Sequence, residues 1–230
     1  MRAQFSASKM QRHVQPVTYL ITSGATYLQT TPSSKEFEDV LKVVAAAVAA
    51  KVSLIQLREK RLSARVLFEL TVQAAQITLK SDTRLLVNDR ADIARAAGAA
   101  GVHLTTRSLS ADVIRRTFGT DFLIGVSTHS LAEARAARDR DADFAVFGPV
   151  YKTESKETYG APQGVAQLAA VARELTPFPI IALGGIDLNN VKVCSEAGAS
   201  GIAGIGIYRD WEALPEIVKT IRDLFTENAR

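Results

Sequence analysis

The chain has 230 residues, of which 47% are hydrophobic and 23% charged, and its formal net charge is +4. This length and composition predict one globular domain with a large core, and the scattering of basic among acidic residues favours small anionic ligands over nucleic acid. Cys194 is the only cysteine, which excludes an internal disulfide framework and a multi-cysteine metal site and fits a cytoplasmic location.

The N-terminal segment and the apolar runs bear on targeting. Residues 1–16 are polar and basic, and they lack the apolar core and cleavage site of a secretory signal. We expect a flexible N-terminal tail over 1–16 and a single domain over 17–230. The longest apolar run, residues 43–50, is far shorter than the ~20 residues that cross a bilayer, so we expect no membrane partner.

Eight β-rich runs alternate with amphipathic helical stretches along the rest of the chain. Strands are predicted at 17–22, 52–60, 84–89, 101–104, 122–127, 144–148, 179–185 and 201–207. Helices are predicted at 33–50, 63–80, 91–99, 110–118, 130–140, 165–175, 187–198 and 210–225. Strict alternation indicates parallel strands with crossover helices. Eight such units predict an α/β fold of the (β/α)8 TIM-barrel type, because an open doubly wound sheet of this size usually has five or six strands.

Polar residues gather where the predicted strands end, which is where the chemistry of such barrels lies. The two-residue period of the second strand places Gln56, Arg58 and Lys60 on one face. Burying this row without partners would cost several kcal/mol, so an anionic ligand is the expected compensation. The alternative is a salt-bridged plug of the barrel that involves Asp89 or Glu59.

The next three strands end in further polar side chains. Asn88 and Asp89 follow the third strand and suit a hard cation or the orientation of a base, although a lone Asp is more often a helix N-cap. His103 ends the fourth strand and is expected to be half-buried. The fifth strand leads into Ser127 and His129, which would place an imidazole at the barrel mouth; a lone His more commonly packs in the core or on the surface.

The connection after the sixth strand, within residues 146–164, is the longest in the chain. It carries Thr153, Ser155 and Lys156, whose hydroxyls and ammonium group suit a phosphate. The alternative is a solvated lid. The loops after the seventh and eighth strands contain Gly184 and Gly185, and the run from Gly204 to Gly206. Such glycines let backbone N–H groups approach a phosphate, although a tight turn would also explain one pair.

Seven segments, taken together, carry a family resemblance. They are QLREK, NDRADIA, GVHL, IGVSTHSLAEA, FGPVYKTESK, ALGGI and AGASGIAGIGI, in this order between about residues 17 and 208. The chain resembles the thiamine phosphate synthase/TenI family, which implies a (β/α)8 barrel that acts in thiamine biosynthesis. The synthase couples hydroxymethylpyrimidine diphosphate to thiazole phosphate with Mg²⁺ and releases pyrophosphate. TenI-like members tautomerise thiazole carboxylate phosphate to its aromatic form without a metal.

The resemblance also implies roles for individual residues. The pyrimidine and pyrophosphate would be bound by Gln56, Arg58, Lys60, Asn88, Thr153, Ser155 and Lys156, with Ser127 added as a further candidate contact. The thiazole phosphate would be bound by Gly185, Gly204, Ile205 and Gly206. Candidate catalytic residues are His129 and Lys156, and Asp89 is the candidate Mg²⁺ ligand if the chain is a synthase. Gly206 stands where Ser is usual in the family, which weakens a side-chain phosphate contact there.

The clearest departure from the family pattern follows the fourth strand. Synthases read GVHLGQxD there, the Asp being a second metal ligand, whereas this chain reads GVHLTTRSL with Ser108 at that place. A hydroxyl replaces a carboxylate poorly on Mg²⁺. We therefore favour a TenI-like thiazole tautomerase that has no cofactor and uses His129 as acid and base. The alternatives are the synthase with Mg²⁺ and a non-catalytic ligand-binding regulator, and a homodimer is compatible with each.

Overall fold

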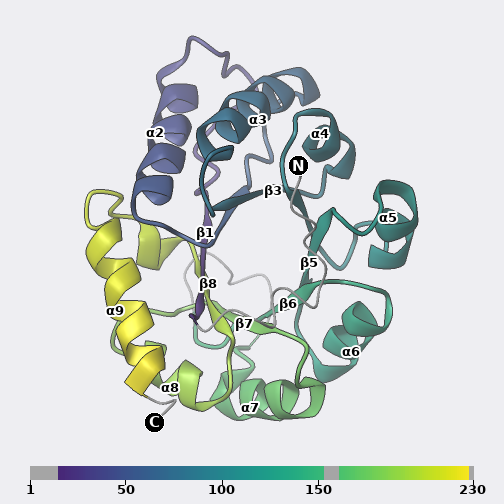
Figure 1. Ribbon diagram of the computed structural model, residues 1–230, viewed down its shortest axis with the longest axis vertical. Helices are drawn as coiled ribbons and strands as arrows, with labels where there is room; N and C mark the ends of the chain where they lie inside the picture. Colours follow the sequence, from purple (N-terminus) through teal and green to yellow (C-terminus); the bar gives the residue numbers. More distant parts are fainter. Residues whose placement is uncertain (1–14, 153–160, 228–230) are drawn as a thin grey trace.

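The computed structural model describes residues 15–152 and 161–227. Its strands form one closed parallel barrel in which each strand neighbours the next and β8 pairs with β1, with the helices arranged around the outside (Figure 1). The strands are β1 (Val17–Ile21), β2 (Leu54–Leu57), β3 (Arg84–Asn88), β4 (Gly101–Leu104), β5 (Leu123–Thr128), β6 (Phe144–Phe147), β7 (Ile180–Leu183) and β8 (Gly201–Gly204). The predicted (β/α)8 barrel is confirmed.

A helix follows each strand and covers the outer face of the barrel. The helices are α2 (Lys35–Ala49), α3 (Ala64–Thr78), α4 (Ala91–Ala96), α5 (Ala111–Phe118), α6 (Leu131–Asp139), α7 (Gly164–Leu175), α8 (Val191–Glu196) and α9 (Leu214–Thr226), with a short 3₁₀ helix, η2 (Gly206–Tyr208), between β8 and α9. Apolar residues at helical spacing create the buried stripe of each long helix, as with Phe37, Val40 and Val44 in α2.

The strands are buried on both faces because their side chains alternate between two cores. One set fills the barrel interior: Val17, Tyr19, Ile21, Leu54, Leu86, Phe144, Val146, Ile181 and Ala203. The other set, which includes Leu20, Ile55, Leu85 and Ile202, packs against the helices. This double burial explains why the strand sequences read as continuous apolar runs.

The second strand is shorter than predicted. It ends at Leu57, so Arg58 and Lys60 lie in the loop that follows and not in a strand row with Gln56. The backbone leaves the sheet because the Arg58 N–H donates to Thr22 Oγ1 at 2.9 Å and the Leu62 N–H returns to the Glu59 carbonyl at 3.3 Å. The expectation of three residues on one strand face was therefore wrong, although all three follow or end the same strand.

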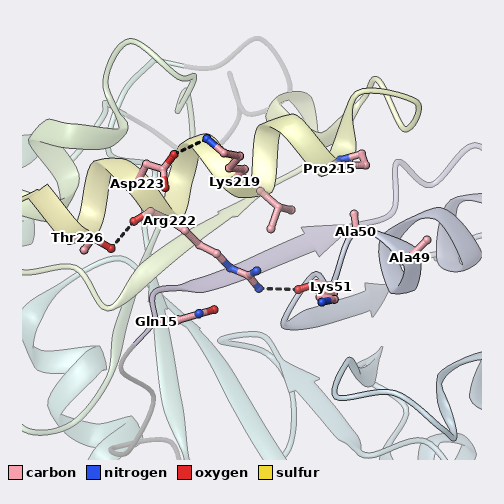
Figure 2. A pocket seen from close by; sticks show the side chains of 10 residues that line it. Gln15, Ala49, Ala50, Lys51, Pro215, Lys219, Arg222, Asp223 and Thr226 are labelled. Carbon is pink, nitrogen blue, oxygen red and sulfur yellow. Dashed lines mark hydrogen bonds and ion pairs between the residues drawn. The ribbon is translucent and has the colours of Figure 1, made fainter.

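The circle of helices closes where α9 meets α2, on the face opposite the C-terminal strand ends. A hollow of about 330 Å³ lies between them, and the Arg222 side chain reaches across it from α9 (Figure 2). Its Nη2 donates to the Lys51 carbonyl just after α2 at 2.8 Å, while its buried Nε has no hydrogen-bond partner among the residues that the structure describes. This contact links the last helix to the first.

Two further expectations concern the ends and the surface of the chain. β1 begins at Val17, and residues 1–14 lie outside the described part of the structure, so the flexible tail stays a prediction. Within residues 15–152 and 161–227, no helix is both long and apolar enough to cross a bilayer.

Candidate active site

The C-terminal ends of the strands, which we call the mouth, bring most of the predicted site residues together. Gln56 on β2 is only 2% exposed, and its Nε2 donates to Asn88 Oδ1 on β3 at 3.0 Å. This contact follows from the register, in which Gln56 lies beside Leu86 and Asn88 is two residues further along the same face. The pair fixes the orientation of both amides.

Glu59, 3% exposed, anchors the loop after β1 to the loop after β2. Its two carboxylate oxygens accept from the hydroxyls of Thr22 and Thr26, each at 2.6 Å, and from the N–H groups of Gly24 and Thr26, each at 3.3 Å. The proposed plug, in which Glu59 forms a salt bridge with the cations of this strand, is not what the structure contains. Glu59 instead holds the backbone from which Arg58 and Lys60 project.

Three cations and one carboxylate lie close together at this side of the mouth. The pKa of Lys60 is lowered by partial burial, then by the positive charges of Arg58 and Arg107, while Asp89 acts in the opposite direction. Arg107 lies in the loop after β4 and was not among the residues predicted from the sequence. The only signal for it was a basic residue in a loop that the fold places at the mouth. The result is a region of positive potential suited to an anion with several charges.

Asp89 follows β3 in the left-handed backbone region, with φ of 62°. Such a conformation is uncommon outside glycine and often occurs at functional sites. The interpretation of Asp89 as a helix cap was wrong, because the N-cap of α4 is Arg90. The Ser108 hydroxyl donates to Asp89 Oδ1 at 2.5 Å, so Ser108 occupies the place beside Asp89 that the family pattern suggests. No group of three or more His, Cys, Asp or Glu residues within the described residues is arranged to hold a metal.

His103 is fully inside the barrel and not half-buried as predicted. Only 2% of its surface is exposed, and its two ring nitrogens contact Tyr19 Oη at 3.0 Å and Ser127 Oγ at 2.8 Å. Tyr19 comes from β1 and Ser127 from β5, so the three side chains cross the barrel interior. Ser127, the half-buried member, is nearest to the mouth along its strand.

His129 follows β5 at the start of α6. Its Nδ1 lies 3.2 Å from Glu133 Oε2, and the same carboxylate oxygen accepts from the His129 backbone N–H at 2.6 Å. Ser130 caps α6 by accepting from the Glu133 N–H at 3.1 Å. A carboxylate on Nδ1 favours the tautomer whose Nε2 can accept a proton. Glu133 was missed by sequence reasoning, although its spacing from Ser130 is that of a capping box.

The predicted phosphate glycines differ in why they must be glycine. Gly184 and Gly185 have φ of 99° and 63°. A Cβ on Gly185 would lie 2.5 Å from the Lys152 carbonyl oxygen, so packing of the loop after β6 already requires the pair. Among the described residues, and apart from its two neighbours in the chain, no atom lies within 4 Å of a Cβ built on Gly206, which is exposed at the start of η2. A Cβ on Gly204 would lie 2.7 Å from Ile207 Cγ2, so within the turn from Gly204 through Ile205 to Gly206 it is Gly206 that is the more informative phosphate candidate.

The strand order separates these groups into two regions of the mouth. Since the strands follow one another around the barrel, β3 and β4 lie across from β7 and β8. Cations and Asp89 occupy the β2 to β4 side, and the glycine turn occupies the β8 side. Ser127 on β5 and His129 just after it come next to the β4 side in the strand order. The predicted residues Thr153, Ser155 and Lys156 lie outside the described residues, so their roles stay predictions.

Sequence comparisons with known proteins point to one family. The family model described as thiamine monophosphate synthase, TMP-TENI, matches residues 26–207. A Geobacter sulfurreducens protein named "Putative thiamine-phosphate synthase" is 48% identical over 77% of this chain and 83% of its own length. The thiamine-phosphate synthase of Clostridium tetani is 31% identical over 87% of this chain and 95% of its own length.

A solved structure supports the same assignment. The structure titled thiamine phosphate pyrophosphorylase from Pyrococcus furiosus is 26% identical to this chain, with a TM-score of 0.75 over 92% of this chain and 96% of that one. Because these relatives are named as enzymes, the non-catalytic regulator is not supported. The chain therefore belongs to the thiamine monophosphate synthase/TenI family and is an enzyme of thiamine biosynthesis.

Proposed function

We propose that this enzyme is a thiamine phosphate synthase, which couples hydroxymethylpyrimidine diphosphate to thiazole phosphate and releases pyrophosphate. The observation that carries the proposal is the separation of two anion regions across the mouth, the cations beside β2 to β4 and the glycine turn after β8. A coupling enzyme needs both regions, whereas a tautomerase with one phosphate needs one. The names of the relatives also favour this function over the tautomerase that the sequence led us to prefer.

The proposed reaction makes one bond and breaks another. The thiazole ring nitrogen bonds to the methylene carbon of the pyrimidine, and the bond from that carbon to the diphosphate oxygen breaks, so pyrophosphate leaves with the electron pair. Negative charge therefore grows on the departing oxygens. Arg58, Lys60 and Arg107 would offset this charge, because preorganised cations stabilise a transition state more than mobile solvent does.

The side chains present fit Mg²⁺ held by one protein carboxylate in place of two. Mg²⁺ usually binds one or two carboxylates together with substrate phosphates, and Asp89 supplies one exposed carboxylate with a hydroxyl, that of Ser108, beside it. Asp89 and the diphosphate oxygens would hold the ion. When bound, it would supply positive charge to the leaving group. Asp112, the other carboxylate near this loop, is paired with Arg116 on α5 at 2.6 Å.

The proposal is tested by measuring thiamine phosphate formation from both substrates as Mg²⁺ is varied. We expect wild-type turnover that requires Mg²⁺. The Ser108→Asp variant should reach half-maximal rate at about tenfold less Mg²⁺, because a second carboxylate adds to the affinity. Asp89→Asn should lower kcat/KM by about 10²-fold.

Asp112→Asn is the matched control, because it removes a carboxylate from the same part of the chain that serves a surface ion pair. It should leave the Mg²⁺ dependence unchanged. A folded wild-type protein that forms no thiamine phosphate at saturating Mg²⁺ would contradict the proposed function.

One observation favours the tautomerase as a second candidate. The contact between His129 Nδ1 and Glu133 prepares Nε2 as a proton acceptor, which a proton shift in the thiazole ring would use. The same assay therefore includes the thiazole carboxylate phosphate tautomer alone, without metal. Turnover of that compound that disappears in a folded His129→Ala variant would favour the second function.

A further inference from the structure

We infer that Tyr19 and His103 are positioning residues that fix the Ser127 hydroxyl as a hydrogen-bond donor toward the heteroaromatic part of a substrate. The three side chains form one connected chain across the barrel interior, from β1 through β4 to β5. Tyr19 Oη lies 3.0 Å from His103 Nδ1, and His103 Nε2 lies 2.8 Å from Ser127 Oγ. Only Ser127 is more than slightly exposed.

The direction of donation along these hydrogen bonds is set at their buried end, by Tyr19. Tyr19 is 0% exposed, and burial raises the pKa of its phenol well above the ordinary value, so the hydroxyl keeps its proton. Among the described residues, the hydrogen-bond partner of this hydroxyl is His103 Nδ1. A buried O–H that does not donate is costly. The phenol therefore donates to Nδ1.

The tautomer of His103 follows from that donation. A neutral imidazole has one donor nitrogen and one acceptor nitrogen. Because Nδ1 accepts from Tyr19, Nε2 carries the proton and donates to Ser127 Oγ. The hydroxyl proton of Ser127 then points away from His103 and donates to another group.

This polarity distinguishes the arrangement from a nucleophilic dyad. A serine 2.8 Å from a histidine resembles a nucleophile with its general base. In that case the third group accepts a hydrogen bond from the histidine Nδ1–H, as a carboxylate does, which leaves Nε2 free to take the serine proton. Here the third group is a phenol that donates, so His103 cannot take the Ser127 proton. The serine serves as a donor to a ligand and not as a nucleophile.

Packing holds the chain rigidly in place. The Tyr19 ring meets Phe144 edge to face, with centroids 5.8 Å apart at 82°, and the His103 and Phe144 rings are 6.3 Å apart. Gly125, two residues before Ser127, makes room for both, because a Cβ there would lie 2.3 Å from Phe144 Cζ and 3.0 Å from His103 Nδ1. The ring of His103 therefore has little freedom to turn.

The position of Ser127 indicates what it contacts. In the strand order, β5 follows the β2 to β4 side that carries the cations and precedes the β8 side that carries the glycine turn. If the proposed function holds, the two phosphate groups occupy those two regions, and the rings of the substrates lie between them. A lone-pair acceptor on a ring, such as a pyrimidine nitrogen, is the chemical class that a fixed hydroxyl donor would select.

The first test needs no variant and no activity. In ¹⁵N-labelled wild-type protein, long-range proton–nitrogen correlation spectra report which ring nitrogen of His103 carries the proton, since protonated and unprotonated nitrogens differ widely in shift. We expect the proton on Nε2. A proton on Nδ1 in the neutral ring would overturn the inference. This measurement is independent of the proposed function.

The second test is a double-mutant cycle in the coupling assay. Tyr19→Phe should lower kcat/KM by about tenfold and Ser127→Ala by about 10- to 10²-fold. Adding Tyr19→Phe to Ser127→Ala should cost nothing further, because Tyr19 acts through the missing hydroxyl. Equal losses in both backgrounds would mean that Tyr19 only packs, and would overturn the inference.

The matched control is Thr83→Val, which removes another buried hydroxyl, one that donates to the Val52 carbonyl at 2.7 Å. It should leave kcat/KM unchanged in both backgrounds. A wild-type protein without coupling activity would contradict the proposed function alone, since the tautomer of His103 would still decide the direction of the chain.

Discussion

At the scale of single residues, the mouth holds like charges that repel one another when no ligand is bound. Lys60 is partly buried and lies near Arg58 and Arg107, and these effects lower its pKa. Asp89 has a left-handed backbone that most side chains avoid. The crowding of positive charge around Lys60 is a cost to the free protein that a bound anion would offset.

The lowered pKa of Lys60 predicts how anion binding depends on pH. Lys60 loses its proton at a lower pH than an ordinary lysine, so the affinity for inorganic pyrophosphate should fall as the pH rises through that lowered value. A bound anion raises the pKa again, and binding in this window should therefore take up a proton. Calorimetry in buffers of different ionisation enthalpy measures both effects.

A charge-conserving pair of variants provides the control. Lys60→Arg keeps its charge at high pH and should abolish the alkaline loss of affinity. Lys80→Arg changes an exposed lysine at the end of the α3 region and should leave it in place. An alkaline loss that persists in Lys60→Arg would assign the titration to another group.

At the scale of elements, Glu59 joins the two loops that begin the mouth. Glu59→Ala would leave the hydroxyls of Thr22 and Thr26 and two backbone N–H groups without their acceptor. Buried donors left unpaired cost about 1–3 kcal/mol each, so we expect the free energy of unfolding to fall by about 3 kcal/mol after relaxation. Urea denaturation measures the change.

The comparison for this prediction is Glu69→Ala, which removes a surface carboxylate of α3 that pairs with Arg65 at 3.3 Å. It should cost less than about 0.5 kcal/mol. Similar losses for the two variants would show that Glu59 contributes no more than a surface charge. The Glu59→Ala variant should also raise KM, because Arg58 and Lys60 project from the loop that Glu59 holds.

At the scale of the whole molecule, stability and chemistry lie on opposite faces of the barrel. The link from Arg222 to the Lys51 carbonyl joins α9 to α2 on the face away from the mouth (Figure 2). Arg222→Ala should lower the free energy of unfolding by about 1–3 kcal/mol, the usual worth of a hydrogen bond to a charged group and its packing. It should leave coupling kcat/KM within about twofold.

Lys219→Ala on the same helix removes an exposed ion pair with Asp223 and should cost no more than about 1 kcal/mol. Thermal unfolding measures the stability of the Arg222→Ala and Lys219→Ala variants, and the coupling assay measures their activity. A loss of activity in Arg222→Ala without a loss of stability would mean that this face communicates with the mouth.

Particular elements and residues show what could be predicted from the sequence alone. Strict alternation of apolar strands and amphipathic helices predicted the barrel, because eight such units have few other ways to bury both faces of every strand. The seven segments predicted the family. Ser108 was correctly placed beside Asp89 by its position in the pattern, but that substitution led us to favour the tautomerase, whereas the names of the relatives favour the synthase.

Only the tertiary structure decided how side chains from distant strands meet. Local sequence periodicity extended β2 through Lys60, and the actual end at Leu57 depends on Thr22 and Glu59, which are 37 residues apart. His103 was predicted to be half-buried and Tyr19 carried no prediction, yet the closed barrel brings these two residues, 84 apart in the sequence, within hydrogen-bonding distance. Strand patterns record which residues are buried, because burial repeats with a fixed period. Hydrogen bonds across the barrel depend on register, closure and ring orientation, which no local pattern contains.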